Sequence, residues 1–495
     1  MQADKDYYAI LGTSPVATDE EIRLAFRQLA RQLQPYADTD PEIEAQFQEV
    51  QEAYETLSNP RRRKPYDHWR SQQGFDRSSA LSLHVIGSHD SLLALPDEQA
   101  YYALLSMMPM TNLPTARLPL NVCVVLDRSV SMKGVRLQQV KEAINHIIDK
   151  LQPEDVFSLV VFSDRAKVLL PGQPHIDQAM AKSVVSTIQA SGGTEILQGL
   201  LPGLEEVKRN QAEHTVNHLI LLTDGDTYGD EQGCLEQAKW AGLNKIHLST
   251  IGIGSDWNED LLEQMADVSG GNSIYIDSLE KVTSIFSATM QNLETVVARE
   301  VFVKFDLSPN VWLHEAYQIT PHLSSLENRD NKVNLGSLSV NQEKSMLMEF
   351  RVKDKSLGEY RLVRITVEGD MPGQVSRTWE WVELKTHFVE QLDPEAKIPS
   401  QITASLSKLA IYRMQQKVAE DLAAGRIETA TQRLQLIATR LLDLGEPELS
   451  HAAIVEAGQL ARTSKLSADG LKKIRYGTRA LTSDETSLFS TRMIN

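Results

Sequence analysis

Cysteine and long apolar runs are scarce in this 495-residue sequence. Only Cys123 and Cys234 occur, with no CxxC spacing, so we expect neither a disulfide framework nor a cysteine metal site. No apolar run approaches the ~20 residues that span a bilayer, and residues 1–20 lack the apolar core of a signal peptide. These absences predict a cytoplasmic protein without a membrane partner.

Positive charge is also in short supply. The chain has 50 Lys and Arg residues against 67 Asp and Glu, which gives a formal net charge of −17. Sequence-independent binding to nucleic acid needs a cationic surface, so we expect no nucleic-acid partner. The sequence also contains no Walker loop, nucleophile elbow or zinc-protease helix, and we therefore expect no enzymatic activity.

The length predicts three or four domains, and the hydrophobic pattern changes along the chain. Strand-like alternation surrounds a region where buried parallel strands such as "NHLILLTD" alternate with amphipathic helices such as "VRLQQVKEAINHIIDKL". We predict a multidomain α+β fold. Its parts are a helical domain over 1–70, the first part of an antiparallel β-sandwich over 71–117, a doubly wound α/β domain over 118–293 inserted into that sandwich, its second part over 294–392, and a helical C-terminal region over 393–495.

Polar clusters lie where a ligand would bind in the α/β domain, beyond the carboxyl ends of its strands. "LDRSVSM" supplies Asp127, Ser129 and Ser131, "SGGTEI" supplies Thr194, and "LLTDGD" supplies Asp224. Two carboxylates and three hydroxyls, with no imidazole or thiol, form the kind of donor set that Mg²⁺ prefers. The pattern predicts a metal site, and the alternative is that these residues only cap loops.

The same five residues carry a resemblance to a known family. Residues 118–293 resemble a von Willebrand factor A domain, and the five match the Asp-x-Ser-x-Ser, Thr and Asp of its metal-ion-dependent adhesion site. The resemblance implies that Mg²⁺ or Mn²⁺ bridges to an Asp or Glu of a partner protein. The family commonly has glycine between the two serines, and Val130 stands there. Valine resists positive φ, so the loop would be strained if the turn needed that conformation.

The N-terminal 70 residues resemble a J domain. "DYYAILG" at 6–12, the pattern of two helices and "EAYETLSNPRRRKPYDHW" at 52–69 carry the resemblance. In that family a His-Pro-Asp loop between the second and third helices triggers ATP hydrolysis by heat-shock chaperones. Gln34, Pro35 and Tyr36 stand in the predicted loop, and only the proline matches. The resemblance therefore implies a degenerate J-like module that does not stimulate the chaperone ATPase.

A basic stripe remains on the second helix of this module. Arg23, Arg27 and Arg31 follow one another at intervals of four residues, so they share one helix face. The stripe is either a docking face for a partner or a solvated helix surface. The sequence leaves both interpretations open.

The rest of the chain points to interaction rather than catalysis. Residues 78–480, including "LKKIRYGTRAL" at 471–481, resemble bacterial proteins that carry a von Willebrand A domain. We expect a non-enzymatic scaffold that binds a protein with an exposed Asp or Glu. Family analogy suggests an AAA+ ATPase or a signalling protein as that partner. The alternative is a J-domain co-chaperone that delivers clients to a heat-shock ATPase.

Overall fold

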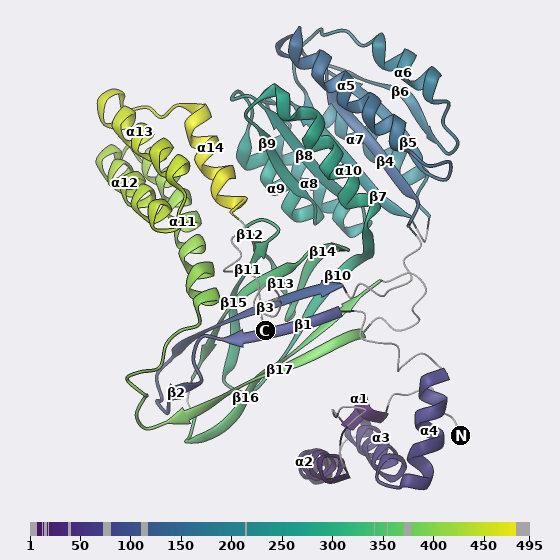
Figure 1. Cartoon of the computed structure of the whole chain (residues 1–495), viewed down its shortest axis with the longest axis vertical. Helices are drawn as coiled ribbons and strands as arrows, with labels where there is room; N and C mark the ends of the chain where they lie inside the picture. The colour runs from purple at the N-terminus through teal and green to yellow at the C-terminus, as the bar shows by residue number, and fades with distance from the viewer. Residues whose placement is uncertain are drawn as a thin grey trace. The chain divides into compact units, whose positions relative to one another are not determined.

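The computed structural model describes most of the chain in two compact units, Met1–Ala80 and Leu81–Asn495 (Figure 1). The described residues are 7–11, 13, 17, 19–37, 41–72, 81–109, 117–212, 215–340, 342–353, 355–370 and 378–481.

The described part of the N-terminal unit is helical. It contains α1 (Tyr7–Leu11), α2 (Asp19–Ala37), α3 (Pro41–Leu57) and α4 (Pro60–Gln72). Apolar residues that recur at intervals of three and four positions along these helices face a common core. Ile22 and Leu57 are fully buried there, and the ring of Phe26 stacks on that of Tyr54 with centroids 4.1 Å apart. The predicted pairing of two long helices is confirmed.

The predicted position of the degenerate loop is wrong. Helix α2 continues through Gln34, Pro35 and Tyr36 and ends at Ala37, so these three residues belong to the end of a helix. Their side chains lie outside the described residues. Proline lacks an N–H and so removes one backbone hydrogen bond, but here this loss does not end the helix. The prediction followed the position of the loop in the J-domain family and so ended this helix several residues too early.

A six-stranded sheet forms the centre of the α/β domain. Its strand order is β6 (Ala166–Gln173), β5 (Val156–Phe162), β4 (Leu120–Asp127), β7 (Val216–Thr223), β8 (His247–Ile253) and β9 (Asn272–Ile276). Neighbouring strands are parallel except β5 and β6. Its helices are α5 (Val135–Lys150), α6 (Gln178–Ser186), α7 (Ile196–Arg209), α8 (Glu231–Leu243), α9 (Glu259–Ser269) and α10 (Val282–Glu294), with the short 3₁₀ helices η1 (Val130–Met132) and η2 (Leu279–Lys281).

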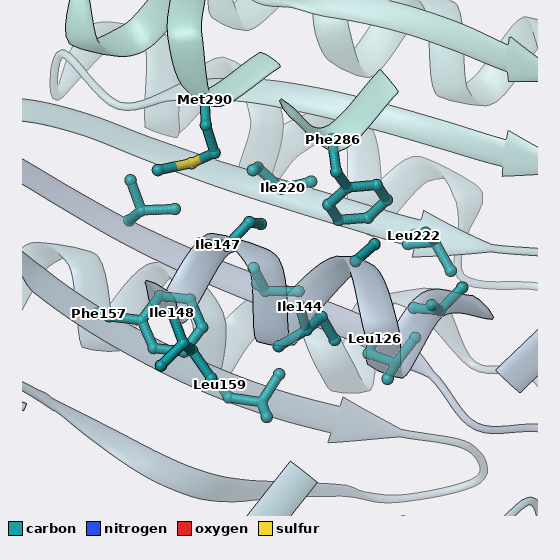
Figure 2. Packing of buried hydrophobic residues seen from close by; sticks show 14 of the residues in the cluster. Leu126, Ile144, Ile147, Ile148, Phe157, Leu159, Ile220, Leu222, Phe286 and Met290 are labelled. Carbon is teal, nitrogen blue, oxygen red and sulfur yellow. The ribbon is translucent and has the colours of Figure 1, made fainter. Parts of the chain in front are cut away.

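Both faces of this sheet are covered, which explains why its central strands are apolar throughout. All residues of β4 are buried. Val122, Val124 and Leu126 join the core on the side of α5 and α10, and Cys123 and Val125 join the core on the side of α7, α8 and α9. Figure 2 shows isoleucines of α5 and Phe286 of α10 over the strands.

Two further sheets form the predicted sandwich. One has the order β1 (Leu81–Gly87), β3 (Gln99–Pro109), β15 (Lys344–Val352), β11 (Val311–Thr320) and β12 (Ser324–Leu326). The other has the order β13 (Asn328–Arg329), β14 (Lys332–Ser339), β10 (Val296–Leu307), β16 (Gly358–Gly369), β17 (Thr378–Val389) and β2 (Ser91–Leu93).

Strand pairing shows how the α/β domain is inserted. β3 precedes that domain in the chain, β15 follows it, and the two are antiparallel neighbours with Leu104 opposite Leu347 (Figure 1). The edge strand β2 pairs in parallel with β17, the single departure from the predicted antiparallel arrangement among the described strands of the sandwich.

The C-terminal region packs on both parts of the larger unit. Its helices are α11 (Ser400–Ala423), α12 (Ile427–Asp443), α13 (Pro447–Thr463) and α14 (Ala468–Arg479). Gly425 and Gly445 have positive φ just after α11 and α12, a conformation that glycine adopts readily and that commonly ends a helix. Leu409 of α11 joins a core cluster of the sandwich, and Tyr476 of α14 joins one of the α/β domain. Within the described ranges, no helix has the length and apolarity needed to cross a membrane.

Candidate metal centre

The candidate site forms where two central strands end. β4 ends at Asp127 and β7 ends at Thr223, and these strands are parallel neighbours with Leu126 opposite Leu222. The chain passes from β4 to β5 on one side and later to β7 on the other, so the strand order reverses at β4. In a doubly wound sheet this reversal opens a crevice at the carboxyl edge.

Asp127 is fully buried and anchors the site. Its Oδ1 accepts a hydrogen bond from the backbone N–H of Ser129 at 2.7 Å, and its Oδ2 accepts one from Thr223 Oγ1 at 2.7 Å. Burial raises the pKa of Asp127 to about 6, and these hydrogen bonds oppose part of that rise. Sequence reasoning missed Thr223, although it stands directly before Asp224 in "LLTDGD".

The two serines connect Asp127 to Asp224. Ser129 Oγ lies 2.9 Å from Ser131 Oγ, and Ser131 Oγ donates to Asp224 Oδ1 at 2.7 Å. Ser129 Oγ also lies 3.4 Å from the same carboxylate oxygen. The alternating Asp-x-Ser-x-Ser pattern therefore turns its polar side chains to one side.

Val130 does not strain this loop. It begins η1, its side chain is 60% exposed, and it is not among the described residues with positive φ. A residue with negative φ has no need of glycine. The strain that would follow from positive φ at this position is therefore absent.

Thr194 stands at the edge of the cluster. Its loop lies beside the Asp127 loop, because Val130 N–H donates to the carbonyl of Gly192 at 3.1 Å. Thr194 Oγ1 lies 2.9 Å from the position that a Cβ on Gly225 would take, so it contacts the residue after Asp224. Among the described residues, Thr194 makes no hydrogen bond to the other four predicted ligands.

Arg136 is the charged neighbour that sequence reasoning missed. Its Nη1 donates to Asp224 Oδ2 at 2.7 Å, and the Asp224 side chain is 0% exposed while that of Arg136 is 34% exposed. The ion pair compensates part of the buried negative charge. The only signal in the sequence was a cation in the first turn of the helix that follows the motif.

The donors present fit a hard divalent cation. They are carboxylate and hydroxyl oxygens, which Mg²⁺ and Mn²⁺ accept as ligands. In the described parts of the chain, no three His, Cys, Asp or Glu side chains gather as a metal site, so this set depends on its hydroxyls. Asp127, Ser129, Ser131 and Asp224 converge, and Thr194 lies next to them.

The basic stripe of the N-terminal unit is solvent-exposed. Arg23, Arg27 and Arg31 all lie exposed on α2. Their exposure agrees with both interpretations, a docking face and a solvated surface.

Three family models match this chain. They are the von Willebrand factor type A domain over residues 121–288, the DnaJ domain over 6–67, and the Sll0103-like, C-terminal alpha-helical domain over 400–484. The first two are protein-interaction domains, and the DnaJ match links the N-terminal unit to chaperones.

Similar proteins extend these matches. The uncharacterized protein sll0103 of Synechocystis sp. is 30% identical over 332 residues, which are 65% of this chain and 78% of that protein. Protein YfbK of Escherichia coli is 25% identical over 238 residues, which are 46% of this chain and 41% of YfbK. A von Willebrand factor type A structure from Catenulispora acidiphila shares the fold with a TM-score of 0.69 and 17% identity, over 82% of this chain and 99% of that one. The chain therefore belongs to the Sll0103-like family of von Willebrand factor type A proteins and carries an N-terminal J-like domain.

Proposed function

We propose that this protein is a non-enzymatic scaffold that binds a carboxylate of a partner protein through a divalent cation. Asp127, Ser129, Ser131, Thr194 and Asp224 would hold the ion, Mg²⁺ or Mn²⁺. The observation that carries the proposal is the convergence of Asp127, Ser129, Ser131 and Asp224. The hydroxyl oxygens of the two serines and Oδ1 of Asp224 lie 2.7 to 3.4 Å from one another.

The composition of the donor set supports binding of a partner carboxylate. Mg²⁺ prefers six oxygen ligands, and five side chains leave at least one position for an oxygen from outside. The two carboxylates balance the charge of the ion, and the other three ligands are neutral hydroxyls, so the ion would stay electrophilic enough to accept another carboxylate. Such a ligand set favours recognition of an exposed Asp or Glu.

The cluster offers little for catalysis. Burial raises the pKa of Asp127 to about 6, which would suit a general base. Both of its oxygens already accept hydrogen bonds, and its side chain is fully buried. Among the residues that the structure describes, neither serine has a histidine or lysine as a hydrogen-bond partner.

The proposal is tested by an affinity pull-down with the full chain, in Mg²⁺ and in EDTA. A partner retained only in Mg²⁺ and lost with Asp224→Ala supports the metal bridge. Asp256→Ala is the matched control, because Asp256 is exposed and lies outside the cluster. A partner that is retained in EDTA and by Asp224→Ala contradicts the proposal. An AAA+ ATPase or a signalling protein is the class of partner that we expect, and the cytoplasmic location stays a prediction.

For the N-terminal unit we propose binding without ATPase stimulation. Gln34 and Tyr36 replace the imidazole and the carboxylate of the family motif, so the charged contact is lost. The co-chaperone alternative is favoured by the DnaJ-domain match over residues 6–67, and the exposed stripe of Arg23, Arg27 and Arg31 is compatible with it. Steady-state ATP hydrolysis by a heat-shock chaperone, with the full chain added, decides between them. We expect no stimulation, and a severalfold rise would establish the alternative.

A further inference from the structure

We infer that Arg136 is a second cationic group of the adhesion site: it competes with the metal for Asp224 and then binds the partner's carboxylate beside the metal. This inference rests on the proposed function. It assigns a residue outside the five-residue motif to partner recognition.

The competition follows from the contacts of one carboxylate. Asp224 Oδ1 accepts the hydrogen bond of Ser131, and Asp224 Oδ2 pairs with Arg136 at 2.7 Å. A divalent cation held by Asp224 would lie within a few ångströms of the guanidinium. Two positive groups at that distance repel each other, most strongly where water is excluded. Metal binding is therefore expected to weaken the ion pair between Arg136 and Asp224.

The position of Arg136 makes it depend on a negative partner. It is the second residue of α5, and the N-terminal end of a helix carries a partial positive charge that disfavours a cation. Asp224 offsets this cost. When the metal takes the charge of Asp224, the guanidinium needs another anion, and a partner's carboxylate at the same site can provide it.

The guanidinium also has the reach and the donors for a second carboxylate. It carries five N–H donors, of which Nη1 serves Asp224, and its side chain is 34% exposed. Gly254 lies close to this guanidinium, and a Cβ at that position would be only 3.1 Å from Nη2 of Arg136. Because glycine has no Cβ, the space beside Nη2 stays open. Arginine binds a carboxylate through two parallel hydrogen bonds, which a lysine cannot do. The site then recognises its partner by one metal and one arginine.

The first test measures Mn²⁺ affinity of the full chain by titration calorimetry. Arg136→Gln should bind Mn²⁺ about tenfold more tightly, the effect of removing one like charge close to the ion. Arg136→Lys keeps the charge and should stay near the wild type. Arg128→Gln is the matched control, because Arg128 belongs to the same loop but donates to Ser191 Oγ and not to Asp224. Far-UV circular dichroism checks that each variant folds.

The outcomes separate this inference from the proposed function. If the wild type binds Mn²⁺ and Arg136→Gln binds it with equal or lower affinity, the inference is overturned and the proposed function stands. If only Arg136→Gln binds Mn²⁺, the competition is supported. If neither protein binds Mn²⁺, both ideas are overturned.

The second test uses acetate as a carboxylate probe on the Mn²⁺-loaded proteins, followed by the water-proton relaxation that bound Mn²⁺ enhances. Arg136→Gln should bind acetate about tenfold more weakly than the wild type, which corresponds to the loss of one charge-assisted pair. Arg136→Lys should fall between them. Equal acetate affinities for the wild type and Arg136→Gln overturn the role in carboxylate binding.

Discussion

Lys472 of α14 holds Trp257 in the loop that follows β8. Its Nζ donates to the carbonyl oxygen of Trp257 at 2.5 Å and lies 4.2 Å from the centre of the indole ring. The same ammonium donates to the carbonyl of Ser255 at 2.6 Å and lies 3.4 Å from Glu259. The side chain is 3% exposed, so α14 is joined to the α/β domain through a buried cation.

Removing this cation should loosen α14. Lys472→Met leaves the carbonyls of Ser255 and Trp257 unpaired, and we expect a loss of about 2–3 kcal/mol in the free energy that holds α14 on the α/β domain. Hydrogen exchange of residues 254–259 and 468–479 should become faster. Lys473→Met is the control, because Lys473 is exposed on the same helix. Equal exchange in the two variants would show that Lys472 is not the anchor.

Acid should destabilise the larger unit through its buried histidines. Burial lowers the pKa of His218 to about 3, and it lowers the pKa of His322 to about 3 as well. Both stay neutral in the folded protein, whereas histidines of the unfolded chain take up protons near pH 6.5. The unfolded state then binds more protons between pH 6.5 and 3, so the free energy of unfolding falls by about 1.4 kcal/mol per pH unit for each histidine.

One variant isolates this effect. His218→Gln can keep a hydrogen bond to Ser249 Oγ, which lies 2.8 Å from His218 Nε2, and it removes one titrating group. Its urea unfolding between pH 6.5 and 5 should depend on pH less steeply than that of the wild type. His451→Gln, at an exposed position of α13, should leave the slope unchanged. Identical slopes for all three proteins would contradict the linkage.

Val130 should not limit metal affinity. Because its φ is not positive, Val130→Gly relieves no backbone strain and should change Mg²⁺ affinity less than about twofold. The glycine adds freedom to the unfolded chain and should lower stability by about 0.5–1 kcal/mol. Mg²⁺ titration and thermal unfolding check both expectations. A large gain in affinity would mean that valine does strain the metal-bound loop.

Gly225 should be needed to place Thr194. A Cβ at this position would lie 2.9 Å from Thr194 Oγ1, so Gly225→Ala pushes the threonine away from its place beside Asp224. Loss of one hydroxyl ligand should weaken Mg²⁺ binding about tenfold, the effect expected when a ligand contact worth ~1.4 kcal/mol is removed. Thr194→Ser keeps a hydroxyl and should retain most of the affinity. Unchanged binding by Gly225→Ala would remove Thr194 from the ligand set.

The sequence was informative where a local pattern determines the structure. The uniformly apolar run of β4 indicated a strand covered on both faces, and the ends of β4 and β7 placed Asp127 near Asp224. This inference works because parallel strands in one sheet end at the same edge, so polar residues after different strands come together.

The features that the sequence did not predict depend on contacts between distant residues, which no local pattern encodes. Arg136 reaches Asp224 because of how the first turn of α5 is set relative to β7, and these residues are 88 positions apart. Tyr476 meets Ser273 across 203 positions, at 3.0 Å between their hydroxyls. The extension of α2 past Pro35 was missed because the J-domain resemblance placed a loop there, and a proline does not always end a helix.

The proposed function requires that this site binds a divalent cation through Asp224 and its neighbours. The most direct measurement is calorimetric titration of Mg²⁺ into the full chain, Asp224→Ala and Asp256→Ala. We expect one saturable site in the wild type and in Asp256→Ala, and none in Asp224→Ala. Absence of Mg²⁺ binding in the wild type, or equal binding in all three proteins, would contradict it.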